Sequence, residues 1–102
     1  MALRVNCDNF DKEVLQSDQP VLVDFYSDSC IPCKMLAPVL SQIESENSDR
    51  LKVVKVNVNF DIELAELFDV QAAPTLVYFK KGEEQARHRG AVRKDEIEAM
   101  IY

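Results

Sequence analysis

The stretch "VDFYSDSCIPCKMLAPVL", Val23 to Leu40, decides how the chain folds, because it joins two different patterns through a pair of cysteines. Before the pair, the run Val21–Tyr26 is almost continuously apolar, which predicts a strand buried on both faces of a sheet. After it, apolar residues recur at helical spacing from Pro32 to about Glu46, including Met35, and predict an amphipathic helix. Cys30 and Cys33 therefore lie at a strand-to-helix junction.

Three chemical roles are available to this pair. A structural zinc site needs four ligands, usually from two close pairs, whereas the remaining candidates, Cys7 and His88, are far apart in the sequence. No metal is therefore expected. A purely structural crosslink is disfavoured because closing so small a loop removes little chain entropy. A reactive dithiol is the role that the position favours, since C-x-x-C beside a βαβ pattern is typical of redox sites.

The predicted helix start gives the two sulfurs different tasks. Cys30 falls where unpaired backbone N–H groups and the helix dipole favour an anion, which lowers a thiol pKa. Cys33 follows one turn later and lies deeper, in a position to attack a disulfide formed at Cys30. Pro32 between them limits backbone freedom. We therefore predict Cys30 as nucleophile and Cys33 as resolving thiol.

Two ionisable residues on predicted strands are candidates for the same site. A carboxylate such as Asp24 inside a buried strand should have a raised pKa, and it is interpreted as the proton acceptor for Cys33. The alternative is an acid tolerated at a strand end. Lys55, on the strand "LKVVKVNV", is expected either to neighbour Asp24 and modulate it or to be an exposed edge lysine.

The rest of the chain predicts a single α/β domain over residues 1–102. The order β-α-β-α-β-α-β-β-α gives a mixed central sheet of about five strands, flanked on both faces by about four helices. Lys81-Gly82 marks a hairpin turn between the last two strands. The segment Asp61–Val70 is predicted to be a helix that gives the core Ile62, Ala65, Leu67 and Phe68.

Composition excludes several functional classes. A net charge of −6 argues against a nucleic-acid surface, and the basic stretch Arg87–Lys94 is interpreted as a solvated edge. The apolar runs are too short to span a bilayer, so no membrane association is expected. The first residues lack the apolar core of a secretory signal, which makes the cytoplasm the expected location. We expect no cofactor, because neither G-x-G-x-x-G nor a phosphate loop is present. We also expect a monomer.

Taken together, these motifs resemble the thioredoxin family. The stretch Val23–Leu40 is similar to the family's strand, active-site loop and helix, with Cys-x-Pro-Cys-Lys at its centre. "AAPTLVYFKKGE" is similar to its cis-proline loop, strand and hairpin, and "RGAV" to its last glycine turn. The resemblance covers nearly the whole chain in order, and it implies the thioredoxin fold.

The resemblance also implies a function and further site residues. The protein would reduce disulfides in protein substrates through a reversible Cys30–Cys33 disulfide, with electrons from a thioredoxin reductase. Asp24 would be the buried acid and Lys55 its neighbour. Pro74, which precedes a strand, would be cis, and the backbone of Ala73 would pair with substrate. The apolar docking surface would consist of Ile31, Pro32, Gly90 and Ala91.

The chain also departs from the family pattern. Ser29 stands where the family usually has tryptophan, Ile31 stands where glycine is usual, and the chain has no tryptophan. These changes leave the dithiol chemistry intact but affect the redox potential and the choice of partner. A binding module without redox activity is the alternative function. Retention of Cys30, Cys33, Asp24 and Pro74 together argues against it.

Overall fold

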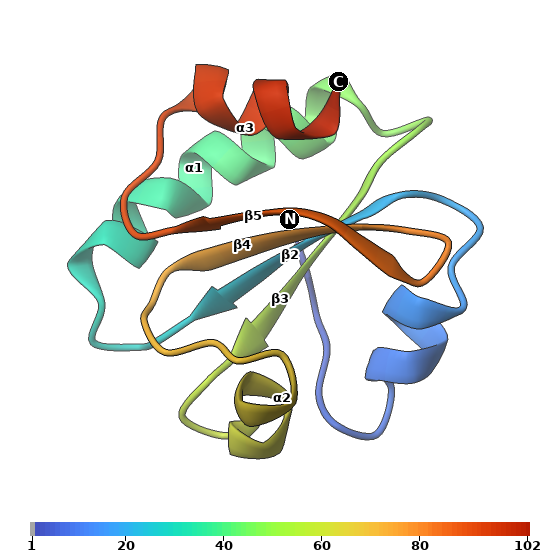
Figure 1. Ribbon diagram of the computed structural model, residues 1–102. Coiled ribbons are helices and arrows are strands. Elements are labelled where there is room, and N and C mark those ends of the chain that lie inside the picture. Colours follow the sequence, from blue (N-terminus) through green and yellow to red (C-terminus); the bar gives the residue numbers. More distant parts are fainter. Residues whose placement is uncertain (1) are drawn as a thin grey trace.

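A five-stranded sheet forms the centre of the protein in the computed structural model, which describes residues 2–102. Its strands are interleaved with helices in the predicted order (Figure 1). The elements are β1 (Leu3–Arg4), the short π-helix η1 (Asp11–Leu15), β2 (Val21–Tyr26), α1 (Ile31–Glu46), β3 (Lys52–Asn57), α2 (Ile62–Leu67), β4 (Thr75–Lys80), β5 (Glu83–Arg89) and α3 (Lys94–Ile101).

The sheet is mixed, as the sequence predicts. Its strand order is β1-β3-β2-β4-β5. The crossovers make β1, β3 and β2 parallel, whereas β4 runs antiparallel to both β2 and β5. Figure 1 shows α1 and α3 on one face of the sheet, with α2 and η1 on the other. This α/β arrangement is the thioredoxin fold.

Side chains of β2 alternate between two hydrophobic cores, one on each face of the sheet. Val21, Val23 and Phe25 belong to the core under α2 and η1, together with Val54, Val77 and Phe79. Leu22 belongs to the core under α1 and α3. Burial on both faces explains why β2 is a nearly continuous apolar run. By the same alternation, Asp24 and Tyr26 are on the α1 face of the sheet.

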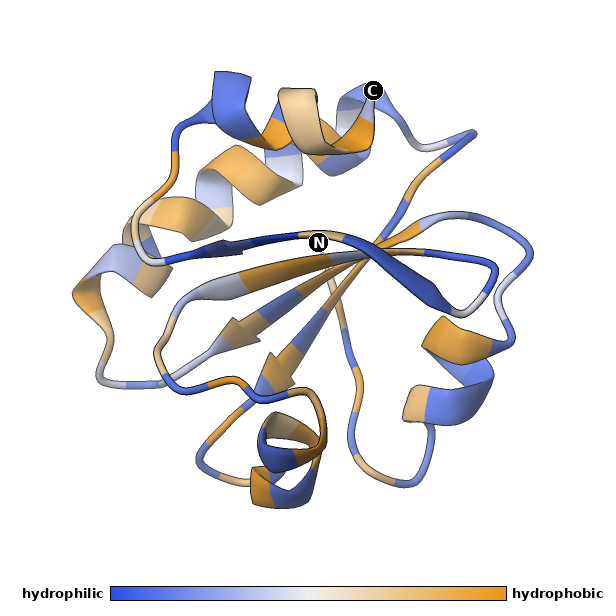
Figure 2. Cartoon of the chain, viewed as in Figure 1, coloured by the Kyte–Doolittle hydropathy of each residue, from blue (hydrophilic) through white to orange (hydrophobic). Residues whose placement is uncertain are grey.

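The hairpin between β4 and β5 turns at Lys81-Gly82, as predicted. Both residues have positive φ, 50° and 79°, which a two-residue type I′ turn requires. A Cβ on Gly82 would lie only 2.7 Å from the carbonyl oxygen of Leu15, so glycine is needed there. In Figure 2, β4 is largely apolar and the edge strand β5 largely hydrophilic, which protects the edge from pairing with other chains.

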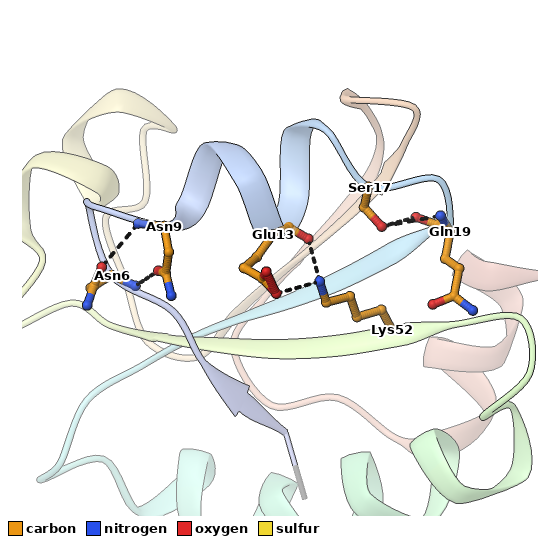
Figure 3. Close-up of polar contacts among 6 residues, drawn as sticks. All are labelled: Asn6, Asn9, Glu13, Ser17, Gln19 and Lys52. Carbon is orange, nitrogen blue, oxygen red and sulfur yellow. Dashed lines mark hydrogen bonds and ion pairs between the residues drawn. The ribbon is translucent and has the colours of Figure 1, made fainter.

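Polar contacts attach the N-terminal segment to the sheet (Figure 3). Lys52 Nζ, on β3, donates hydrogen bonds to both the carbonyl oxygen and Oε1 of Glu13, each at 2.9 Å. The backbone N–H of Asn6 donates to Asn9 Oδ1 at 2.7 Å, and Asn9 N–H donates to Asn6 Oδ1 at 3.2 Å. These bonds hold η1 over the sheet face that Phe10 covers.

Some apolar side chains predicted to be core residues are exposed. Ile62 and Leu67 of α2 are 55% and 71% exposed. The predicted burial of Ala65 is confirmed, and Leu64, which was not predicted, is buried as well. Met35 has helical spacing within α1 yet is 71% exposed, because α1 faces the sheet with Leu36, Leu40 and Ile43. The predicted burial was therefore wrong for Ile62 and Leu67. Of the two positions expected for Met35, in the core or lining the site, its exposure excludes the core.

Two phenylalanines provide a matched test of the core. Phe25 is fully buried in β2, whereas Phe60 is 71% exposed and contacts Arg4 through a cation–π interaction. Phe25→Ala should lower the free energy of unfolding by about 3–5 kcal/mol, because it leaves a cavity in a closed core. Phe60→Ala should lower it by less than about 1 kcal/mol. Urea denaturation of both variants measures these losses, and equal losses would contradict the described packing.

Candidate active site

The cysteine pair lies at the first turn of α1, immediately after the loop that follows β2. Cys30 is the N-cap residue of α1, and its Sγ accepts a hydrogen bond from the backbone N–H of Cys33 at 3.1 Å. The two cysteines form a disulfide, with their Cα atoms 5.2 Å apart. Cys33 is only 5% exposed, whereas Cys30 is half-buried. The two sulfurs therefore differ in access to solvent.

A proline loop lies directly against Cys30. The Ala73–Pro74 peptide bond is cis, and the carbonyl oxygen of Ala73 is 3.4 Å from Cys30 Sγ. Thr75 Oγ1 donates a hydrogen bond to the carbonyl oxygen of Ala72 at 2.6 Å. The loop is thus held at the start of β4 with one backbone carbonyl next to Cys30 Sγ.

A glycine turn forms the third side of the site. Gly90 follows β5 with φ of 83°, a conformation that favours glycine. Its N–H donates a hydrogen bond to the carbonyl oxygen of Pro74 at 2.7 Å. The structure thereby brings together the three loops that contain the expected docking residues. Ile31 is 70% exposed, and Pro32 and Ala91 are also exposed. Ala73 and Gly90 are half-buried.

Asp24 and Lys55 are neighbours on adjacent parallel strands. Their Cα atoms are register partners between β2 and β3, and both side chains are on the α1 face. Asp24 is 6% exposed, and its Oδ1 has no hydrogen-bond partner among the described residues. Burial raises the pKa of Asp24 to about 7, although the positive charge of Lys55 acts in the opposite direction. Lys55 Nζ is 5.6 Å from the centre of the Tyr26 ring.

A cavity is lined by both Asp24 and the buried cysteine, Cys33. Its volume is about 200 Å³, and its lining includes Asp24, Lys55 and Cys33. A second cavity of about 180 Å³ is also lined by Asp24 and Lys55. Each has room for water molecules, which occupy about 30 Å³ apiece in the liquid. Water can therefore link Asp24 to Cys33.

Sequence reasoning missed two residues near the site. Met35 lies one turn after Ile31 on α1 and is similarly exposed, whereas its helical spacing alone left a core position and a lining position open. Arg89 is exposed at the end of β5, immediately before Gly90, but was grouped with a solvated charged stretch. Only the tertiary arrangement separates Arg89 from the other basic residues of that stretch.

The third cysteine is outside the site. Cys7 is exposed and its Sγ donates a hydrogen bond to Glu63 Oε2 at 3.3 Å. Partial desolvation, with contributions from the Glu63 and Asp61 carboxylates, raises the pKa of Cys7 to about 11.

Among residues 2–102, no group of three or more His, Cys, Asp or Glu side chains is arranged to hold a metal. In the same range, no helix is both long and apolar enough to cross a bilayer.

An accessible cysteine at a helix start, disulfide-bonded to a buried one on this fold, defines a thiol–disulfide oxidoreductase. Comparisons with known proteins agree. The family model of the thioredoxins matches residues 1–102. A thioredoxin of Acidithiobacillus ferridurans is 40% identical over 99 residues, covering 97% of this chain and 92% of the relative. Thioredoxins of Rickettsia felis and Pseudomonas aeruginosa are each 38% identical, covering 95% and 91% of this chain and 92% and 86% of the relatives.

The chain therefore belongs to the thioredoxin family. The activity predicted from the sequence is confirmed at this level: the protein is a thiol–disulfide oxidoreductase of the protein-disulfide reductase type. Its substrates are disulfide-containing proteins. The individual roles of the site residues stay predictions.

Asp24 makes the stability of the protein depend on pH. Because the pKa of Asp24 is about 7 when folded and near 3.8 when exposed, the folded state binds more protons between these pH values, and stability falls as pH rises through them. Asp24→Asn removes this loss. At pH 8 the free energy of unfolding of the oxidised variant should exceed that of the oxidised wild type by up to about 4 kcal/mol, since one pKa unit corresponds to about 1.4 kcal/mol. Urea unfolding at pH 5 and pH 8 measures the difference.

The matched control for this prediction is Asp49→Asn, which removes an exposed carboxylate at the far end of α1. The control should keep the pH dependence of the wild type. Parallel profiles for the wild type and Asp24→Asn would show that Asp24 titrates normally.

Proposed function

We propose that the protein reduces protein disulfides by two successive thiol–disulfide exchanges at Cys30 and Cys33. The Cys30 thiolate attacks one sulfur of the substrate disulfide, and the other substrate sulfur leaves as a thiolate that takes up a proton. Cys33 then attacks Cys30 Sγ, which forms the Cys30–Cys33 disulfide and releases the second substrate thiol. Two electrons pass from the cysteine pair to the substrate.

The observation that carries this assignment is the placement of Cys30 at the N-terminus of α1. The N–H of Cys33 donates to its sulfur at 3.1 Å, and the helix dipole favours the same negative charge. Both interactions stabilise a thiolate. Cys30 is also the more accessible sulfur, so it takes the role of nucleophile, while the buried Cys33 takes that of resolving thiol.

Asp24 is assigned as the group that accepts the proton of Cys33. A general base works best when its pKa is near the operating pH, and burial raises the pKa of Asp24 to about 7. The cavity that both side chains line supports proton transfer through water. Lys55 has the supporting role, because its charge keeps the pKa of Asp24 from rising further.

The docking surface is assigned to the three loops around Cys30. An extended substrate segment would pair with the backbone of Ala73, next to cis-Pro74, and contact Ile31, Pro32, Gly90 and Ala91. The 70% exposure of Ile31 supports this role, since an apolar side chain beside the reactive sulfur is available for contact. We further propose that the chain acts as a single domain and a monomer in the cytoplasm. A thioredoxin reductase would re-reduce the pair.

Insulin reduction with dithiothreitol tests the assignment. The wild type should accelerate the reaction, and Cys30→Ser should lower the rate to that of the reagent alone, because no nucleophile remains. Cys33→Ser should accumulate a mixed disulfide at Cys30, visible by mass spectrometry. Cys7→Ser is the control and should keep the wild-type rate. A Cys30→Ser variant that still turns over insulin would refute the proposed mechanism.

A further inference from the structure

Arg89 differs from the other basic side chains around it because it has no carboxylate partner. Three basic residues of the same stretch are in ion pairs: Arg87 with Glu84 at 2.8 Å, Arg93 with Asp95 at 3.1 Å, and Lys94 with Glu46 at 3.0 Å. His88 Nε2 also lies 3.4 Å from Glu96 Oε2. Across residues 2–102, Arg89 has no ion pair or side-chain hydrogen bond, and it is exposed. Its guanidinium group is therefore available to an outside partner.

The sheet register places Arg89 at the edge of the active site. Arg89 is the Cα partner of Thr75, so both side chains are on the α2 face. Arg87 is on that face too, and its Nη1 donates to the carbonyl oxygen of Asp69 at 3.3 Å. Thr75 Oγ1 donates on the same side to the carbonyl oxygen of Ala72. Arg89 is therefore next to the segment that leads into Ala73 and Pro74.

The covalent connection to Gly90 fixes this position. Arg89 immediately precedes Gly90, whose N–H is bonded to the carbonyl oxygen of Pro74 at 2.7 Å. The carbonyl oxygen of Ala73 is in turn 3.4 Å from Cys30 Sγ. Paired strands are about 4.8 Å apart, so a substrate segment along Ala73 comes within reach of a long arginine side chain.

We propose that Arg89 is a specificity-determining residue that favours disulfide substrates with an Asp or Glu side chain close to the reacting cysteine. This inference rests on the proposed function, in which the substrate segment lies along Ala73. A guanidinium group forms two parallel hydrogen bonds to a carboxylate, a geometry that lysine lacks. The net charge of −6 disfavours acidic partners at long range, so Arg89 acts on an acidic segment only locally, once the segment has docked.

Peptide disulfides provide the test. The substrates are fluorogenic disulfide peptides that differ only by Glu, Gln or Lys, placed in turn at each of the two positions on either side of the reacting cysteine. Reduced protein is mixed with each peptide in single-turnover stopped flow, without a reductase. At low salt and at the best position, the Glu peptide should react about two- to five-fold faster than the Gln peptide, the range of an exposed ion pair.

Variants separate Arg89 from general charge. Arg89→Gln should bring the Glu/Gln ratio of rate constants to about one, and Arg89→Lys should retain part of the preference. Lys80→Gln removes one positive charge on neighbouring strand β4 and should leave the ratio unchanged. Lys80→Gln should also reduce the Gln peptide at the wild-type rate, and the Arg89 variants are compared with the wild type by their Glu/Gln ratios. Addition of 0.5 M NaCl should lower the Glu preference, because salt screens exposed charges.

Each alternative result contradicts a particular statement. Equal rates for Glu, Gln and Lys peptides at every position would overturn the role of Arg89 while leaving the reductase function intact. Loss of the preference in Lys80→Gln as well would assign it to overall charge and not to Arg89. If the reduced protein reduces none of the peptides, the proposed mechanism and the role of Arg89 both fail.

Discussion

The hydrogen bond from the Cys33 N–H to Cys30 Sγ is the interaction on which the proposed mechanism depends. It exists because β2 ends at Tyr26 and α1 begins at Ile31, which makes Cys30 the N-cap residue. The first N–H groups of a helix have no partner within the helix. In α1 one of them, the N–H of Cys33, donates to Cys30 Sγ. Packing against the two hydrophobic cores fixes the positions of the two elements that meet at this junction, β2 and α1. Phe25 and Leu22 anchor β2 from opposite faces, and Leu36, Leu40 and Ile43 anchor α1.

The surrounding structure gives the two cysteines, Cys30 and Cys33, different environments. Cys30 is accessible and lies against the Ala73 carbonyl, whereas Cys33 is buried and shares a cavity with Asp24. A carboxyl group without a partner on one oxygen is costly in a folded protein. Here it shares a cavity with Cys33, the thiol that loses a proton in the proposed mechanism. A destabilising feature at this position is consistent with a role in the reaction and has no evident structural benefit.

Local patterns predicted much of the fold, because β2, α1 and the Lys81-Gly82 turn each carry their own signal in periodicity or backbone chemistry. The cysteine pair was predictable for the same reason. Met35, Ile62 and Leu67 were not, since helical spacing gives an apolar side of a helix but not which side meets the sheet. The placement of Asp24 and Lys55 side by side depends on strand register. The isolation of Arg89 depends on which carboxylates tertiary structure brings to its neighbours. Neither can be read from adjacent residues.

Alkylation of the fully reduced protein with iodoacetamide, followed over pH with peptide mapping of each cysteine, tests the central claim most directly. The account predicts that Cys30 reacts first, with a pKa at or below about 7.5, compared with about 8.5 for an ordinary thiol. Cys7 provides the internal comparison, because partial desolvation and the nearby carboxylates of Glu63 and Asp61 raise its pKa to about 11 and so leave little thiolate at neutral pH. A Cys30 pKa of about 8.5 or above, or faster reaction at Cys7 than at Cys30 at pH 7, would contradict a helix-stabilised thiolate.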